Sequence, residues 1–174
     1  MLRTFIRPRL AGALLLATLL GGCATAPAAT QRVSFVVVRH AEKADDGSKD
    51  PPLSAAGQAR ATALAASLRD APLRAAYATG YRRTQATAAP AAQAHALAVT
   101  TYDASRPASE FAVQLRHDHR DGTVLVVGHS NTAPAIAAAL CACEVAPMGD
   151  GEFDRRLTIT IDARGAATLR DERY

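Results

Sequence analysis

Two short apolar runs stand out along the chain and predict buried strands. Residues 33–38 (VSFVVV) and 123–127 (TVLVV) are nearly unbroken stretches of apolar, mostly β-branched residues. Runs of this kind are typical of strands that are covered on both faces of a parallel sheet. Weaker runs at 73–79 and 97–101 predict two further strands.

Between these strands, apolar residues return at helical spacing. The predicted helices are one capped by Ser54 and closed by Pro72, one over 82–95 that Pro90 interrupts or bends, one with Pro107 in its first turn, and one that ends near Cys141. Strand patterns at 156–162 and 166–170, separated by Arg164-Gly165, predict a hairpin at one edge of the sheet. Alternating strands and helices favour an α/β fold, a three-layer αβα sandwich with a mostly parallel central sheet.

The first 22 residues have the layout of an export signal. Three arginines in the first nine residues precede an apolar run at 10–22, which is shorter than the ~20 residues needed to cross a bilayer. The run closes with Leu20-Gly21-Gly22-Cys23, which resembles the lipobox of bacterial lipoproteins. The resemblance implies that Cys23 is acylated. The alternative is an ordinary secretory signal with a coincidental cysteine.

This interpretation divides the chain into a signal peptide (1–22), a lipidated Cys23 with its tether (23–32) and one domain (33–174). Ala24 stands where lipoproteins retained in the inner membrane typically have Asp. The resemblance therefore implies a lipid anchor in the outer membrane, with the domain facing the periplasm.

The positive charge of the chain is concentrated in this leader. The net charge is +4, from 20 Lys and Arg against 16 Asp and Glu. Without the three leader arginines, the remaining chain is near neutrality, which argues against a nucleic-acid partner. No pattern indicates an obligate protein partner.

Polar residues follow three of the predicted strands where each strand ends: Arg39-His40, 79–83 and Gly128-His129. In parallel sheets, ligands bind outside the carboxyl ends of the strands. Arginine forks suit phosphate or carboxylate oxygens, and histidine serves as a nucleophile or a proton donor. These residues alone predict an anion pocket with two histidines.

Four blocks in this order resemble the signature of the histidine phosphatase superfamily, which includes the cofactor-dependent phosphoglycerate mutases. The blocks are Val38-Arg39-His40-Ala41-Glu42-Lys43, Asp50-Pro51-Pro52-Leu53-Ser54-Ala55-Ala56-Gly57-Gln58-Ala59-Arg60-Ala61, Thr79-Gly80-Tyr81-Arg82-Arg83-Thr84-Gln85-Ala86-Thr87-Ala88 and Val127-Gly128-His129-Ser130-Asn131-Thr132.

The resemblance implies a role for each matched residue. His40 would attack phosphorus and carry the phosphoryl group, while Arg39, Arg83 and His129 would bind its oxygens. Arg83 is chosen over Arg82 because the arginine of the family stands four residues before a Thr, here Thr87. No metal and no cofactor is expected, because guanidinium and imidazolium supply the positive charge.

The proton donor for the leaving group is left between two residues, Asp103 and Glu110, and Asp103 is preferred because it lies closer to the end of the predicted strand. The segment 102–110 is too short for a large cap, which implies an open pocket and disfavours a mutase. The resemblance implies a phosphatase that acts on small phosphomonoesters through a phosphohistidine. The alternatives are a non-catalytic lipoprotein that binds phosphosugars or phosphate and, third, a phosphomutase.

Two other groups of residues suggest metal or redox chemistry. His117 and His119 point to nearly opposite sides of a helix, so chelation is not expected. Cys141 and Cys143 are expected either to form a disulfide in an oxidising periplasm or to remain a reduced pair.

Overall fold

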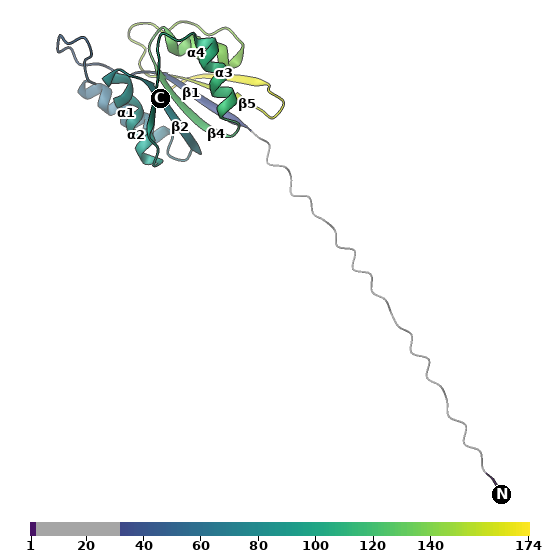
Figure 1. Ribbon diagram of the computed structural model, residues 1–174. Helices are drawn as coiled ribbons and strands as arrows, with labels where there is room; N and C mark the ends of the chain where they lie inside the picture. Colours follow the sequence, from purple (N-terminus) through teal and green to yellow (C-terminus); the bar gives the residue numbers. More distant parts are fainter. Residues whose placement is uncertain (3–31) are drawn as a thin grey trace.

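Six strands form one sheet in the order β3-β2-β4-β1-β5-β6 in the computed structural model, which describes residues 1–2 and 32–174 (Figure 1). The strands are β1 (Val33–Arg39), β2 (Leu73–Thr79), β3 (Val99–Tyr102), β4 (Gly122–Gly128), β5 (Arg155–Ile161) and β6 (Ala167–Arg173). β1 to β4 run parallel, and β5 and β6 are antiparallel to their neighbours. The C-terminal hairpin at one edge is therefore confirmed.

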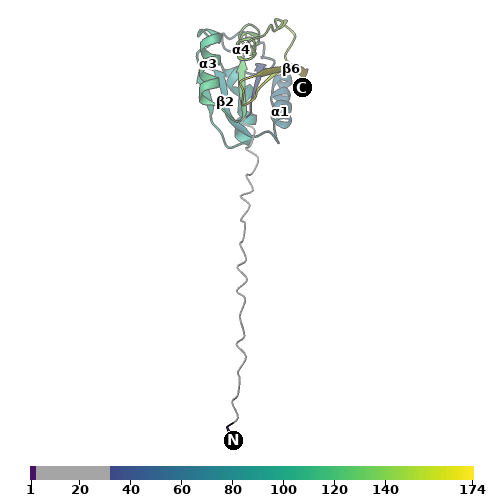
Figure 2. The same ribbon diagram turned by 90° about the vertical axis from the view of Figure 1, so that its right-hand side faces the viewer.

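Two helices cover each face of this sheet. They are α1 (Ala55–Ser67), α2 (Arg82–Ala94), α3 (Ala108–Asp118) and α4 (Thr132–Cys141). α1 packs beside α2, and α3 packs beside α4. Figure 2 shows α3 and α1 on opposite sides of the molecule. The predicted three-layer αβα sandwich is confirmed.

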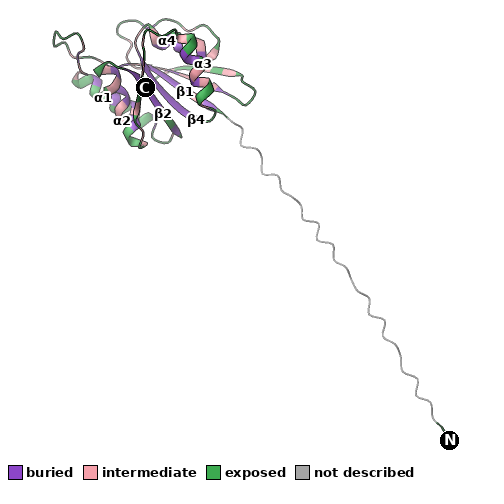
Figure 3. Ribbon diagram, viewed as in Figure 1, coloured by how far each residue is buried: buried purple, intermediate pink, exposed green. Residues whose placement is uncertain are grey.

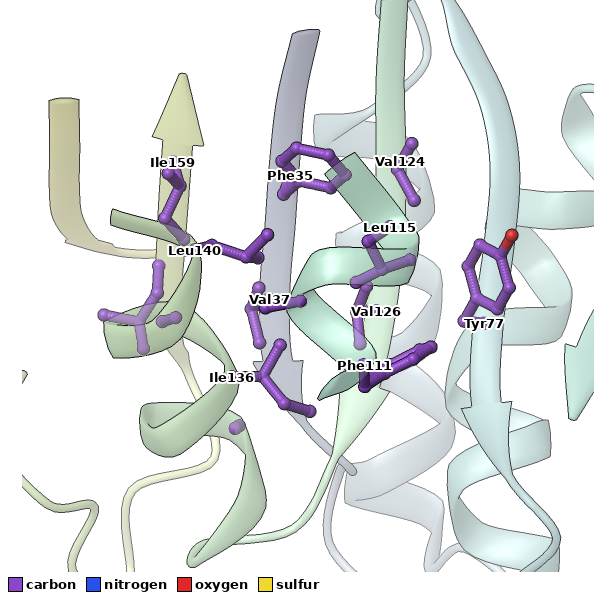
Figure 4. Packing of buried hydrophobic residues seen from close by; sticks show 14 of the residues in the cluster. Phe35, Val37, Tyr77, Phe111, Leu115, Val124, Val126, Ile136, Leu140 and Ile159 are labelled. Carbon is purple, nitrogen blue, oxygen red and sulfur yellow. The ribbon is translucent and has the colours of Figure 1, made fainter. Parts of the chain in front are cut away.

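The two apolar runs are the central strands, and alternate residues face opposite layers. Phe35 and Val37 pack with α3 and α4, as Figure 4 shows, whereas Val36 and Val38 pack in the cluster that includes α1 and α2. All four are at most 4% exposed, and in Figure 3 the strands are the most continuously buried part of the described chain. An unbroken apolar run is needed because neither face of these strands meets water.

Two predicted element boundaries differ from the structure. α2 runs through Pro90 without a break. Pro90 cannot donate to the carbonyl of Ala86, but Ala86 is exposed, so water can hydrate that carbonyl. The third strand begins at Val99, because Ala96 and Leu97 still donate to carbonyls of the last turn of α2 and so belong to its end.

The predicted leader and Cys23 lie outside the described residues, apart from positions 1–2. Within the described part, no helix has the length and apolar character to span a bilayer. Cys141 and Cys143 are joined by a disulfide. Among the described residues, the three buried clusters begin at Val33.

Candidate active site

The carboxyl ends of β1, β2 and β4 bring the predicted polar residues to one edge of the sheet. Arg39 pairs in register with Gly128, and the N–H of His40 donates to the Gly128 carbonyl at 2.9 Å. A Cβ on Gly128 would lie 2.7 Å from Thr132 Oγ1 and 3.0 Å from the Tyr102 hydroxyl. A larger residue would therefore push apart the segments that carry the site.

His40 has the protonation state of a nucleophile. Its side chain is buried, and Nδ1 lies 2.8 Å from the carbonyl oxygen of Ala41. Since a carbonyl only accepts, Nδ1 carries the proton of the neutral ring and Nε2 keeps its lone pair. Burial lowers the pKa of His40 to about 4, aided by the charges of Arg83, His129 and Arg39 and opposed by the Ala41 hydrogen bond. The ring is therefore neutral at pH 7.

His129 lies edge-on to His40, with 5.4 Å between the ring centroids. Its Nε2 is 3.0 Å from Thr79 Oγ1, which is 2.9 Å from Thr84 Oγ1. The Thr84 hydroxyl donates to backbone carbonyls, so it accepts from Thr79, and Thr79 accepts from His129. Nε2 is thus the protonated nitrogen of the neutral ring. Burial, followed by the charges of Arg83 and Arg39, lowers the pKa of His129.

An aromatic ring lies against the guanidinium group of each arginine of the site. The Arg39 guanidinium lies 4.2 Å from the Phe153 ring centroid and donates to the carbonyls of Gly149 and Asp150 at 2.9 and 2.8 Å. The Arg83 guanidinium lies 4.4 Å from the Tyr81 ring centroid. These contacts fix both guanidinium planes beside the histidines.

One donor on each of these arginines is unused. The Nε atoms of Arg39 and Arg83 are buried without a hydrogen-bond partner among the described residues. A buried donor without a partner costs about 1–3 kcal/mol. The guanidinium charges of Arg39 and Arg83 both act on His40 and His129, so the site favours an anion such as phosphate.

The sequence and the fold resemble those of known phosphatases. The model of the histidine phosphatase superfamily (branch 1) matches residues 35–106, a range that holds Arg39, His40 and Arg83. Over these residues the chain is similar to the histidine phosphatase superfamily. No curated protein sequence matches the chain.

Solved structures of phosphatases share the fold at low sequence identity. The protein histidine phosphatase SixA complexed with tungstate is 18% identical, with a TM-score of 0.62 over 82% of this chain and 96% of that chain. The phosphoserine phosphatase of Entamoeba histolytica with 3-phosphoglyceric acid is 14% identical, with a TM-score of 0.62 over 82% and 97%. A mycobacterial glucosyl-3-phosphoglycerate phosphatase is 16% identical, with a TM-score of 0.61 over 83% and 98%.

The second histidine phosphatase block has a structural explanation in this chain. Gly57 lies so close to the Glu42 backbone that a Cβ would be 2.1 Å from the Glu42 carbonyl oxygen. Ser54 caps α1 by accepting from the Gly57 N–H at 3.1 Å. Arg60 donates hydrogen bonds to the Glu42 carboxylate through Nε and Nη2 at 2.6–3.0 Å. Together these contacts fix the chain immediately after His40.

The arginine pair of the third block is divided between two roles. The side chain of Arg83 acts on both histidines electrostatically, whereas the side chain of Arg82 is exposed. The backbone N–H of Arg82 donates to the Asp50 carboxylate at 3.1 Å, and Arg83 Nη1 lies 3.4 Å from the same oxygen. Asp50 therefore positions the start of α2.

The two candidate proton donors lie at the margin of the site. Asp103 is exposed beside Gly80 and Tyr81, and it accepts from the backbone N–H and the hydroxyl of Ser105 at 2.8 Å. These hydrogen bonds lower the pKa of Asp103. Glu110 is exposed in the first turn of α3, 3.6 Å from Arg106. The structure thus brings Arg39, His40, Arg83 and His129 together and records no contact from either carboxylate to them.

Sequence reasoning missed several residues that shape the site. Asp50, Thr79 and Thr84 lie within the matched blocks, but the sequence assigns them no role, and Phe153 lies outside the blocks. The signal available for Thr79 was its place at the end of a strand, next to the matched arginine. In the described part of the chain, no group of three metal-ligating side chains could hold an ion.

Proposed function

We propose that this chain is a phosphatase that hydrolyses small phosphomonoesters through a phosphohistidine on His40. The observation that carries the proposal is the state of His40: neutral, with Nδ1 bound to a carbonyl and Nε2 free, among two arginines with unused buried donors. SixA, which shares this fold, was solved with tungstate, an oxyanion similar to phosphate.

In the first step, His40 Nε2 attacks phosphorus, a P–N bond forms and the P–O bond to the leaving group breaks. Arg39 and Arg83 stabilise the charge on the equatorial oxygens. In the second step, water attacks phosphorus, the P–N bond breaks and phosphate leaves with His40 neutral again.

Asp103 is assigned to the proton transfers, in preference to Glu110, which is paired with Arg106. Its lowered pKa suits the second step, in which a carboxylate takes a proton from the attacking water. In the first step, the same group must arrive protonated, so leaving groups that need no proton should react fastest.

The hollow beside the site agrees with small substrates. It has a volume of about 310 Å³ and is lined by Tyr81, Arg83, Ala104, His129, Asn131 and Thr132. The short segment between β3 and α3 contains no helix that covers this hollow. This openness favours hydrolysis over the enclosed transfer of a mutase.

The proposed location is the periplasmic side of the cell envelope, through a lipid on Cys23 in the outer membrane. Leu20-Gly21-Gly22-Cys23 and the basic, apolar segment before it support this proposal.

Turnover of a phosphomonoester panel by the purified chain tests the function. We expect release of phosphate from p-nitrophenyl phosphate and from members of the panel, and loss of turnover in His40→Ala. His117→Ala, which changes an exposed histidine of α3, is the matched control and should keep full turnover. If the wild-type protein binds phosphate but releases none from any phosphomonoester, the non-catalytic binding lipoprotein becomes the preferred function.

A further inference from the structure

A second positively charged cavity lies at the edge of the sheet opposite the active site. Val33, the first residue of β1, pairs with Gly122 at the start of β4 and with Ile161 at the end of β5. α3 also ends at this edge, since it runs from the end of β3 toward the start of β4. A cavity of about 320 Å³ opens there, between the end of α3 and the turn at 162–165.

Three arginines line this cavity without an ion-pair partner. Arg116 and Arg120 come from the end of α3, and Arg164 comes from the turn between β5 and β6. Among the described residues, the ion pairs include none of the three. Three guanidinium groups at one concave site attract an anion.

Acidic groups at this edge make contacts of their own, and the one that lines the cavity, Asp162, offsets one of its three positive charges. Asp162, which also lines the cavity, accepts the backbone N–H groups of Arg164 and Ala166 through Oδ1 at 2.9 Å. Asp121 lies 3.4 Å from Arg74, and Asp118 lies 2.9 Å from His117.

His119, the remaining titratable group of the lining, contacts the Tyr77 hydroxyl through Nε2 at 2.9 Å. Burial lowers its pKa, so it adds no charge at pH 7. The arginines therefore make the net charge of the cavity lining positive.

Stabilisation of a helix end explains these arginines only in part. Basic residues near a helix C-terminus interact favourably with its dipole, and Arg116 Nη1 lies 3.4 Å from the Leu140 carbonyl oxygen. Arg120 lies beyond the last residue of α3, and Arg164 belongs to a hairpin turn. A role in ligand binding accounts for all three.

The position of the cavity points to a membrane surface. Residues 24–32 separate Cys23 from Val33, and nine residues span at most roughly 30 Å. If Cys23 carries lipid, Val33 and the edge of the sheet around it lie within roughly 30 Å of the bilayer, because the tether joins the domain at this edge. Phospholipid headgroups are then the nearest anions.

We propose that the cavity lined by Arg116, Arg120 and Arg164 binds the phosphate of an anionic phospholipid headgroup and seats the domain on the membrane with its active site directed away. The inference rests on the anchoring proposed above but not on catalysis. Guanidinium forks match phosphate oxygens, and attraction to an anionic surface contributes about a thirtyfold gain in affinity for two basic residues and more for three.

Vesicle sedimentation of the chain 24–174, which lacks Cys23 and the leader, tests the proposal. We expect binding to vesicles of phosphatidylglycerol mixed with phosphatidylcholine, weakening as salt rises, and none to phosphatidylcholine alone. The double variant Arg120→Gln, Arg164→Gln should bind at least about tenfold more weakly. The double variant Arg82→Gln, Arg170→Gln has the same net charge, removes exposed arginines elsewhere and should bind like the wild type.

Equal weakening in both double variants, or no binding by the wild type, would overturn the proposal. Inorganic phosphate distinguishes a free anion from a lipid: if the Arg120, Arg164 pair weakens phosphate binding while the wild type ignores vesicles, the lipid assignment is wrong. Circular dichroism checks that both variants fold. A wild type that binds vesicles yet hydrolyses nothing would contradict the proposed enzyme activity and support the headgroup site.

Discussion

Acid should destabilise this protein through His40, and the size of the effect follows from its burial. The pKa of His40 falls from 6.5 to about 4 on folding, mainly because burial disfavours the charged ring. Below pH 6.5, the unfolded chain binds a proton here that the folded chain does not bind until about pH 4. The free energy of unfolding therefore falls as pH drops through this window and changes no further from this group below it.

The magnitude is about 3 kcal/mol, at roughly 1.4 kcal/mol for each pH unit between the two pKa values. Replacing His40 by Asn removes the titrating ring and keeps a donor for the Ala41 carbonyl. Between pH 7 and pH 4, the wild type should lose about 3 kcal/mol more than His40→Asn, because the other titrating groups are common to both proteins.

Urea unfolding followed by circular dichroism at several pH values measures this difference. Equal losses of stability in the wild type and in His40→Asn would refute the reasoning, because His40 would then be no harder to protonate in the folded protein than in the unfolded chain.

Three further predictions concern the site and the anchor. At phosphate concentrations about 100-fold above Kd, binding should stabilise the wild type by about 2.7 kcal/mol. Arg83→Ala should lose most of this stabilisation in thermal unfolding. A larger loss in Arg82→Ala would show that Arg82, and not Arg83, binds phosphate. Asp103→Asn should slow hydrolysis of alkyl phosphates more than that of p-nitrophenyl phosphate, since nitrophenolate leaves without a proton, and equal slowing of both in steady-state kinetics would count against Asp103 as the acid. Cys23→Ser should abolish incorporation of radiolabelled palmitate, and equal labelling of mutant and wild type would exclude the lipobox.

The sequence was sufficient for the parts of the fold that local patterns determine. The unbroken apolar runs became β1 and β4, and parallel strands place their carboxyl ends at one edge, so Arg39-His40 and His129 had to lie near each other. Ser54 at the start of α1 was readable because capping depends on a few neighbouring residues.

Contacts between distant segments were not readable from local patterns. Arg39 is oriented by Gly149 and Asp150, more than 100 residues away, and by the ring of Phe153. The chain of hydroxyls from His129 through Thr79 to Thr84 depends on the register of two strands and the first turn of a helix. The effect of Pro90 was not readable from local patterns either, because the free energy that it costs α2 depends on whether water reaches the Ala86 carbonyl.

The most direct test of the central claim is to trap the phosphoryl group on His40. Brief exposure to a labelled phosphomonoester, rapid quenching and peptide mapping should reveal an acid-labile, alkali-stable label on the peptide that contains His40, and His40→Ala should abolish both label and turnover. His129→Ala should leave the labelled residue unchanged, because His129 is not the nucleophile. Label on another residue, or near-normal turnover in His40→Ala, would contradict the covalent mechanism.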